Sequence, residues 1–428
     1  MVRSVGMDFG TTNSAVGVVG DDGNVTLARF AHKNGVSDTF RSILYFHPDL
    51  RDSKTNKPAP IAGMRAIDRY LDASGEGRLI QSLKSYLADR TFDHTSVFNR
   101  ALSLVDLLAL LLKDLRARAE EQLGPLGPRI VVGRPVHFSN SDGDADDDFA
   151  LGRLRPAFEA AGFEDIVFEY EPVAAAYYYE TRLDHDELVL IADFGGGTSD
   201  FSVIKVGPSH RHDGKARILA TDGVGIAGDA LDSRILHELV APALGLGSTY
   251  RSMFGTELTV PVWIYERLRR WHHLSFLKTT KNVALIKEIA DQSDEPEKIE
   301  ALWHIVDDDL GYHLYRAVER TKVELSASEE TMFRFEDEPL VIEAPLSRAS
   351  FERWISGETT QMASCVDRVL ASAGVAAGDI DRVFMTGGTS FVPAVRKIFD
   401  ERFGSSKIQA GGEMISVATG LALRAQER

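Results

Sequence analysis

Two short segments of this chain, 185 residues apart, are near copies of each other. Residues 5–14 read VGMDFGTTNS and residues 190–199 read LIADFGGGTS. Each is an apolar, strand-like run that reaches an Asp and then a turn rich in Gly and Thr. Glycines beside a strand end let backbone N–H groups approach phosphate oxygens, and Thr hydroxyls add donors to them. Two such turns predict a two-lobed protein that closes on a magnesium nucleotide.

The carboxylates beside the turns suit magnesium. Mg²⁺ keeps several of its waters and needs few protein ligands, so one carboxylate beside each turn can hold it through its water shell. A single Gly-Gly-Gly-Thr run would also suit an ordinary tight hairpin. The prediction therefore depends on the presence of both copies and on further motifs.

Composition excludes several classes of protein. The 428 residues allow two or more domains, and 44% hydrophobic with 26% charged residues is typical of a folded chain. The net charge of −16 argues against nucleic acid or anionic lipid as a partner. Cys365 is the only cysteine, which excludes an intrachain disulfide and a cysteine metal site.

No membrane span is expected. The longest apolar stretch, residues 102–112, is interrupted by polar residues and too short to cross a bilayer. The chain begins directly with a strand-like run and shows no secretory leader, so a cytoplasmic location is expected.

Strand and helix patterns alternate along the chain, which indicates an α/β protein. Residues 4–19 predict a hairpin and residues 102–123 an amphipathic helix. The second half repeats the plan, with strands over 188–193 and 201–206 and a mostly helical stretch over 232–325.

Further motifs occur in order along the chain, at 168–177 (FEYEPVAAAY), 223–232 (GVGIAGDALD), 319–326 (ERTKVELS) and 385–393 (MTGGTSFVP). Together with the two turns, this set resembles the seventy-kilodalton heat-shock chaperones (DnaK-like). The resemblance implies an α/β, two-lobed, actin-like ATPase (ribonuclease-H-like) fold, each lobe split into a core and an outer subdomain.

The resemblance also implies boundaries. Lobe I would cover 1–187, with its core at 1–35 and 102–187 and its outer subdomain at 36–101. Lobe II would cover 188–428, with its core at 188–232 and 313–428 and its outer subdomain at 233–312. A nucleotide-exchange factor or other protein partner could bind that second outer subdomain.

The family's roles carry over to matching residues. Asp8 and Asp193 would hold the magnesium through water, and Thr198, Glu171 and Asp200 would orient the attacking water. The residues expected to bind nucleotide are Gly10, Thr11, Thr12, Asn13, Gly195, Gly196, Gly197, Thr198 and Gly228 near the phosphates, Glu319 and Lys322 at the ribose or adenine, and Gly387, Gly388 and Ser390 at the base.

One departure from the family concerns a catalytic Lys of the first lobe. By register, its position falls near Ala66 and Ile67, with Arg65 the nearest basic residue and Lys84 a less suitable substitute. A lost cationic contact to a transferring phosphoryl group costs on the order of 10²-fold in rate. Slow or absent hydrolysis is therefore expected.

A second departure concerns the base. Val323 stands where the family has an Arg that stacks on adenine, and Met414 stands near a family Asp. A lost cation–π contact is worth about 0.5–2 kcal/mol. ATP remains the favoured ligand, with the base preference open.

The chain ends where the family's nucleotide-binding domain ends, as in its abbreviated, YegD-like members. No peptide-binding domain is expected, so a nucleotide signal would act on a partner in trans. Three functions are considered: a slowly hydrolysing Mg-ATP switch, a nucleotide sensor without turnover, and an actin-like filament protein or sugar kinase. The motifs at 171–176 and 319–326 favour the chaperone branch over the third.

Overall fold

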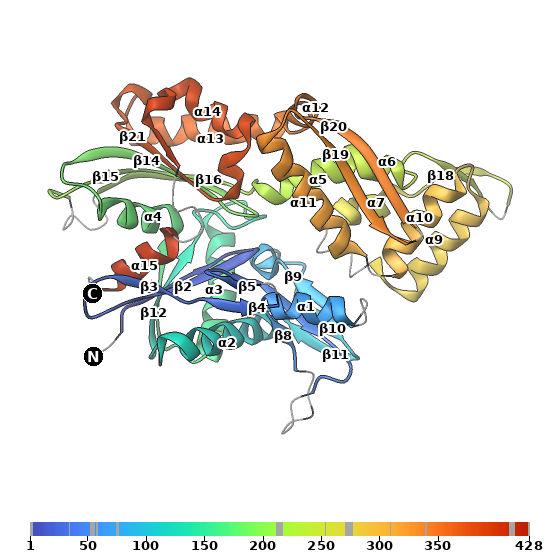
Figure 1. Ribbon diagram of the computed structural model, residues 1–428, viewed down its shortest axis with the longest axis horizontal. Helices are drawn as coiled ribbons and strands as arrows, with labels where there is room; N and C mark the ends of the chain where they lie inside the picture. The colour runs from blue at the N-terminus through green and yellow to red at the C-terminus, as the bar shows by residue number, and fades with distance from the viewer. Residues whose placement is uncertain are drawn as a thin grey trace. The chain divides into compact units, whose positions relative to one another are not determined.

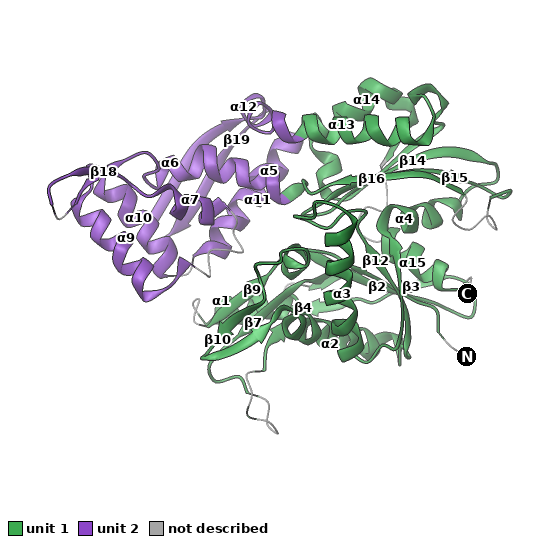
Figure 2. Ribbon diagram, turned by 180° about the vertical axis from the view of Figure 1, so that it is seen from behind, with its two compact units in different colours: residues 1–228, 359–428 green, residues 229–358 purple. Residues whose placement is uncertain are grey.

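The computed structural model describes residues 3–33, 35–51, 56, 59–73, 77–210, 217–252, 254–269, 277–308, 310–338, 340–410 and 416–426. The chain divides into two compact units (Figure 2). Unit 1 comprises Met1–Gly228 and Thr359–Arg428, and unit 2 comprises Asp229–Glu358. The lobe and subdomain boundaries expected above remain predictions.

Unit 1 contains two mixed sheets (Figure 1). The first has the order β13 (Asp165–Tyr170), β12 (Arg129–Arg134), β1 (Val5–Phe9), β2 (Asn13–Val19), β3 (Val25–Leu27), and β6 (Phe40–Arg41) also pairs with β2. The second has the order β22 (Ile408–Ala410), β21 (Arg382–Thr386), β14 (Glu187–Phe194), β15 (Ser199–Val206), β16 (Ile218–Val224).

The two sheets share one topology. In each, the central strand (β1 or β14) runs antiparallel to the next strand in sequence and parallel to a strand that comes later. Both central strands are almost completely buried, as their apolar sequences predict. The repeat seen in the sequence is therefore a repeat of strand topology, and the two Gly-Thr turns occupy equivalent places.

Two helices join these sheets. α4 (Glu171–Glu180) contacts β14 and β15, α15 (Ser416–Gln426) contacts β1 and β2, and the helices contact each other (Figure 1). Ala174 and its two alanine successors are fully buried. A Cβ on Gly420 of α15 would lie 1.7 Å from the Ala174 carbonyl oxygen, so small residues permit this close packing.

The remaining elements of unit 1 surround the sheets. Its helices include α2, which begins at a capping box between Ser103 and Asp106 and ends at Gly124, as predicted for 102–123. The remaining bounds are β4 (Phe30–His32), β5 (Gly35–Ser37), β7 (Ile43–Phe46), β8 (Ile61–Ala62), α1 (Met64–Asp72), β9 (Arg78–Gln81), η1 (Leu83–Tyr86), β10 (His94–Val97), β11 (Arg100–Ser103), α2 (Leu104–Leu123), α3 (Asp144–Ala160), α13 (Ser356–Ala373), η5 (Ala377–Asp379), η6 (Gly388–Phe391), α14 (Pro393–Phe403) and η7 (Ser405–Lys407).

Unit 2 is mostly helical, as predicted for 232–325, and also has two hairpins. Its elements are α5 (Gly228–Ile235), η3 (Leu236–Val240), α6 (Ala241–Ala243), β17 (Thr249–Arg251), β18 (Glu257–Thr259), α7 (Val262–Arg269), α9 (Thr280–Gln292), α10 (Pro296–Asp307), α11 (Gly311–Ala327), β19 (Glu330–Asp337), β20 (Leu340–Ser347) and α12 (Arg348–Trp354). Across the described ranges of both units, no helix combines the length and apolar character needed to cross a bilayer.

Candidate functional site

The first Gly-Thr turn connects β1 to β2 and is held from outside. A Cβ on Gly10 would lie 2.1 Å from the Asn13 carbonyl oxygen, so a side chain there would not fit. The Ser42 hydroxyl donates to the Gly10 carbonyl at 2.8 Å, and the Ser42 N–H donates to the Thr12 carbonyl at 2.9 Å. Arg41 donates to the Asn13 side chain at 3.2 Å. These contacts fix the shape of the turn.

The second turn meets the first. A Cβ on Gly197 would lie 3.6 Å from Thr11 Oγ1 of the first turn, 2.6 Å from Ser139 Oγ and 3.7 Å from Ser85 Oγ. The backbone of the second turn therefore faces three hydroxyl groups from three different segments. Thr11 and Gly197 are brought together as expected, whereas Ser85 and Ser139 were not identified from the sequence.

Two of the expected carboxylates face each other beside the second turn. Asp193 on β14 is paired directly with Asp200 on β15. Asp200 Oδ1 accepts a 2.6 Å hydrogen bond from the Val136 N–H, and the carboxylate also accepts one from the Thr198 hydroxyl. Gly195 N–H donates to the Thr198 carbonyl at 2.9 Å, which closes the turn and positions Thr198.

Lys84 joins these carboxylates. Its Nζ lies 2.6 Å from Glu171 Oε1, and both side chains are buried. Glu171 is the first residue of α4. Lys84 is the second residue of η1, a short helix that begins directly after Ser82, whose φ is +54°. Electrostatic interactions connect Glu171 and Lys84 with Asp8, Asp193 and Asp200. We call the group Asp8, Lys84, Glu171, Asp193 and Asp200 the carboxylate cluster.

Burial and like charge perturb the carboxylate cluster. Burial, followed by repulsion from Glu171, raises the pKa of Asp8 to about 7, although Lys84 opposes the change. The same two causes raise the pKa of Asp200 to about 7 against the hydrogen bonds from Thr198 and Val136. The pKa of Asp193 is also raised well above its usual value.

Lys84 stays protonated. Burial lowers its pKa, but attraction to Glu171 and Asp8 outweighs this, so the pKa lies above its ordinary value. The four carboxyl groups of the cluster thus share the single positive charge of Lys84. If all four ionise, negative charge remains that a bound metal ion would neutralise.

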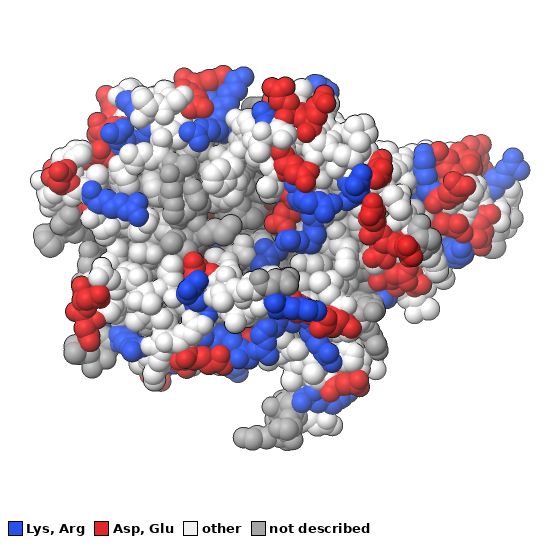
Figure 3. Space-filling view, in the orientation of Figure 1, with Lys and Arg blue, Asp and Glu red and all other residues white. Residues whose placement is uncertain are grey.

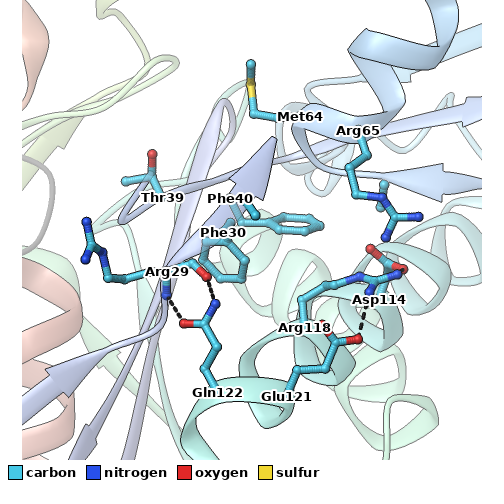
Figure 4. Close-up of a pocket in the computed structure, with 12 residues that line it drawn as sticks. Arg29, Phe30, Thr39, Phe40, Met64, Arg65, Asp114, Arg118, Glu121 and Gln122 are labelled. Atoms are coloured by element: carbon cyan, nitrogen blue, oxygen red, sulfur yellow. Dashed lines mark hydrogen bonds and ion pairs between the residues drawn. The ribbon is translucent and has the colours of Figure 1, made fainter. Parts of the chain in front are cut away.

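The expectation for the family's Lys was wrong. Ala66 and Ile67 are buried on α1, and Arg65 lies beside Asp114 in a separate cavity of about 140 Å³ (Figure 4). Lys84, judged the less suitable residue, is the one that reaches the carboxylates. Its place depends on the turn at Ser82 and on pairing with a residue 87 positions away, which a residue count along the chain does not reveal.

The residues expected at the base belong to different units. On α11 of unit 2, Lys322 Nζ lies 2.8 Å from Asp232 Oδ2, the Tyr315 hydroxyl donates to the same oxygen at 3.0 Å, and Glu319 pairs with Arg316 at 3.1 Å. Lys322 therefore compensates a buried aspartate.

In unit 1, Gly387 follows β21 with φ +87°, and a Cβ on it would lie 1.9 Å from the Phe194 carbonyl oxygen. The Ser390 hydroxyl donates to the Gly387 carbonyl at 2.7 Å, and Gly388 begins η6 between them. This turn thus packs on the end of β14. The base-binding roles of both sets remain predictions.

Three further expected residues need placing. Gly228 is the first residue of α5, and Val323 is 62% exposed on α11. Met414 lies outside the described residues.

The carboxylate cluster fits a hydrated cation. Within the described part of the chain, no three His, Cys, Asp or Glu side chains are arranged to ligate a metal directly. Mg²⁺ commonly keeps most of its waters, and unrelieved carboxylate charge beside a phosphate-sized turn suits that mode of binding. Asp8 and Asp193 would hold such an ion through water.

Comparison with known proteins identifies the class. A family model described as "Hsp70 protein" matches residues 81–243 and 283–426, more than half of the chain. The chain therefore belongs to the Hsp70 family, whose fold is the actin-like ATPase fold, in agreement with the mixed α/β sheets. Membership supports a nucleotide-binding domain of the chaperone type.

Within the family, the chain is similar to chaperone protein DnaK. It is 27% identical to the protein of that name from Thermosipho africanus (strain TCF52B) over 429 residues, which cover 98% of this chain and 58% of the relative. It is 25% identical to the one from Deinococcus proteolyticus over 448 residues, covering 99% and 59%. The chain spans about three fifths of the length of these relatives.

Proposed function

We propose that this protein binds Mg-ATP and hydrolyses it slowly, as a chaperone-type molecular switch. The observation that carries the proposal is the carboxylate cluster with Lys84, beside two Gly-Thr turns that meet at Thr11 and Gly197. The chemistry of phosphoryl transfer requires mostly positioning and charge stabilisation, and these groups supply both.

Each group has a role in this proposal. Bound magnesium would neutralise charge on the phosphates, and Asp8 and Asp193 would hold its waters. Lys84, oriented by Glu171, would contact the terminal phosphate. The Thr198 hydroxyl, held by Asp200, would orient the attacking water together with Glu171.

The switch would act on a partner in trans. ATP and ADP would favour different arrangements of the chain, and a protein partner or exchange factor bound within 233–312 would respond to the difference. A cytoplasmic location and the absence of nucleic acid and membrane from its partners are part of the same proposal.

A nucleotide sensor without turnover is the second candidate. Its motivation from the sequence is the missing Lys together with the missing Arg, and the 2.6 Å contact of Lys84 with Glu171 weakens the first of these. The exposed Val323, which stands where the family has an Arg that stacks on adenine, still favours weaker nucleotide binding. An actin-like filament protein or a sugar kinase ranks third.

A single-turnover assay tests the proposal. The purified chain would be loaded with labelled Mg-ATP, desalted, and followed for retained ATP and ADP over hours. We expect conversion to ADP on the protein, reduced about 100-fold or more in Lys84→Ala and in Thr198→Ala. Lys113→Ala, an exposed lysine on α2, is the matched control and should convert ATP at the parental rate.

Each other outcome selects an alternative. Retained but unconverted ATP would support the sensor. No retention would contradict the proposal altogether. ATP-dependent sedimentation, or transfer of phosphate to a small alcohol, would support the filament protein or the kinase.

A further inference from the structure

Unit 2 contains a cavity of about 420 Å³ between α11 and β19 that the nucleotide proposal does not use. Four of its lining residues are basic: His313, Arg316, Arg320 and Arg334. All four side chains are exposed, and Phe335, 2% exposed, supplies an apolar wall. Figure 3 shows Lys and Arg atoms around α11 with Asp and Glu atoms beside them.

The basic residues share one face of the helix. His313, Arg316 and Arg320 are spaced i, i+3 and i+7, which places them on one side of α11. Tyr315 and Lys322, which bind Asp232, each follow a residue of this set by two positions. At about 100° per residue, they lie on the other side of α11. The cavity is therefore separate from the buried Lys322 pair.

The positive charge of the cavity is only partly neutralised. Arg334 Nε lies 2.6 Å from Glu343 Oε1 and 3.7 Å from Glu336 Oε1, an acidic residue that also lines the cavity, and Arg316 pairs with Glu319 at 3.1 Å. All of these are exposed pairs of small worth. The Arg320 guanidinium donates to the Arg334 carbonyl at 2.8 Å. No ion pair of Arg320 occurs among the residues that the structure describes, so its charge remains available.

We propose that this cavity binds a segment of a partner protein that carries two or more carboxylates. Guanidinium groups match carboxylates in two-point hydrogen bonds, and Arg316 and Arg320 offer two of them along one face of α11. Its volume falls within the roughly 300–1,000 Å³ of typical ligand sites. The chain as a whole has a net charge of −16, so an acidic partner would be repelled elsewhere and directed to this pocket.

The test uses fluorescence anisotropy with labelled hexaglutamate as the probe and the full chain. We expect saturable binding that weakens with added salt and becomes about tenfold weaker in Arg320→Glu, the order of one charge-assisted hydrogen bond. Arg251→Glu, an exposed residue of β17 in the same unit, makes the same charge change outside the cavity and should alter the affinity less than twofold.

Three results would overturn the proposal. The first is no binding of hexaglutamate above that of an uncharged hexapeptide. The second is equal weakening by Arg320→Glu and Arg251→Glu, which would show a general effect of charge. The third is displacement by inorganic triphosphate at concentrations well below those of unlabelled hexaglutamate, which would identify a phosphate ligand. No nucleotide is needed, so the result is independent of the ATPase assay.

Discussion

At the scale of single residues, Asp200 combines a functional position with a cost in stability. Its pKa is about 7 in the folded protein and 3.8 ordinarily, so the folded state holds a proton that the unfolded state releases. The contribution of this group to stability is therefore lost as the pH rises from about 4 to 7.

Replacing Asp200 with Asn removes that charge. We expect Asp200→Asn to be more stable than the parent at pH 8 by roughly 1–3 kcal/mol, with the difference shrinking towards pH 5, while hydrolysis falls sharply. Denaturant unfolding at the two pH values measures this. Asp21→Asn, an exposed aspartate, is the control and should show no such dependence. A less stable Asp200→Asn at pH 8 would contradict the assignment.

The residues of the site were predicted unequally well from the sequence. Of the motif residues, Asp193 and Asp200 meet because β14 pairs with β15. Asp8 joins them because α4 and α15 pack on each other and on the two sheets. Lys84 was misjudged because its partner Glu171 is distant in sequence. Its only local signal was a lysine between apolar residues of 79–87, a place where a charge needs a partner.

At the scale of elements, the contact between α4 and α15 depends on Gly420. A methyl group there would meet the Ala174 carbonyl oxygen at 1.7 Å, and backbone must shift to admit it. We expect Gly420→Ala to destabilise the protein by roughly 2–3 kcal/mol, measured by denaturant unfolding.

A second glycine provides the matched control. Gly152 lies within α3, and a Cβ on it would meet nothing within 4 Å. Gly152→Ala should therefore stabilise the protein by about 0.5–1 kcal/mol, because alanine favours the helix. Equal effects of the two substitutions would show that the close helix contact does not limit stability.

Elements with strong patterns were predicted and others were missed. The hairpin of β1 and β2 and the helix α2 follow from clear apolar spacing and turn residues. The β19–β20 hairpin was overlooked, although Phe333 and Phe335 alternate with exposed Arg334 and Glu336 in the manner of a half-buried strand. Packing of β19 on α11 gives that weak local pattern its buried face.

At the scale of the whole molecule, nucleotide binding should stabilise the chain only with magnesium. Binding at 100 times the dissociation constant adds about 2.7 kcal/mol. We expect ATP with magnesium to raise the melting temperature, more at pH 8 than at pH 6 because Asp8, with a pKa of about 7, ionises between them. Differential scanning fluorimetry with and without EDTA measures both effects. An equal rise in EDTA would exclude the carboxylates as the magnesium site.

The position of α15 has a consequence for biosynthesis. The helix lies near the end of the chain, at residues 416–426, yet it packs on β1 and β2, where a Cβ on Gly6 would meet the backbone of Ala422 at 2.2 Å. The strands β1 and β2 therefore stay uncovered until residues 416–426, far later in the sequence, have been made. During synthesis that apolar face stays open, so this protein would itself benefit from a holding chaperone before its own fold is complete.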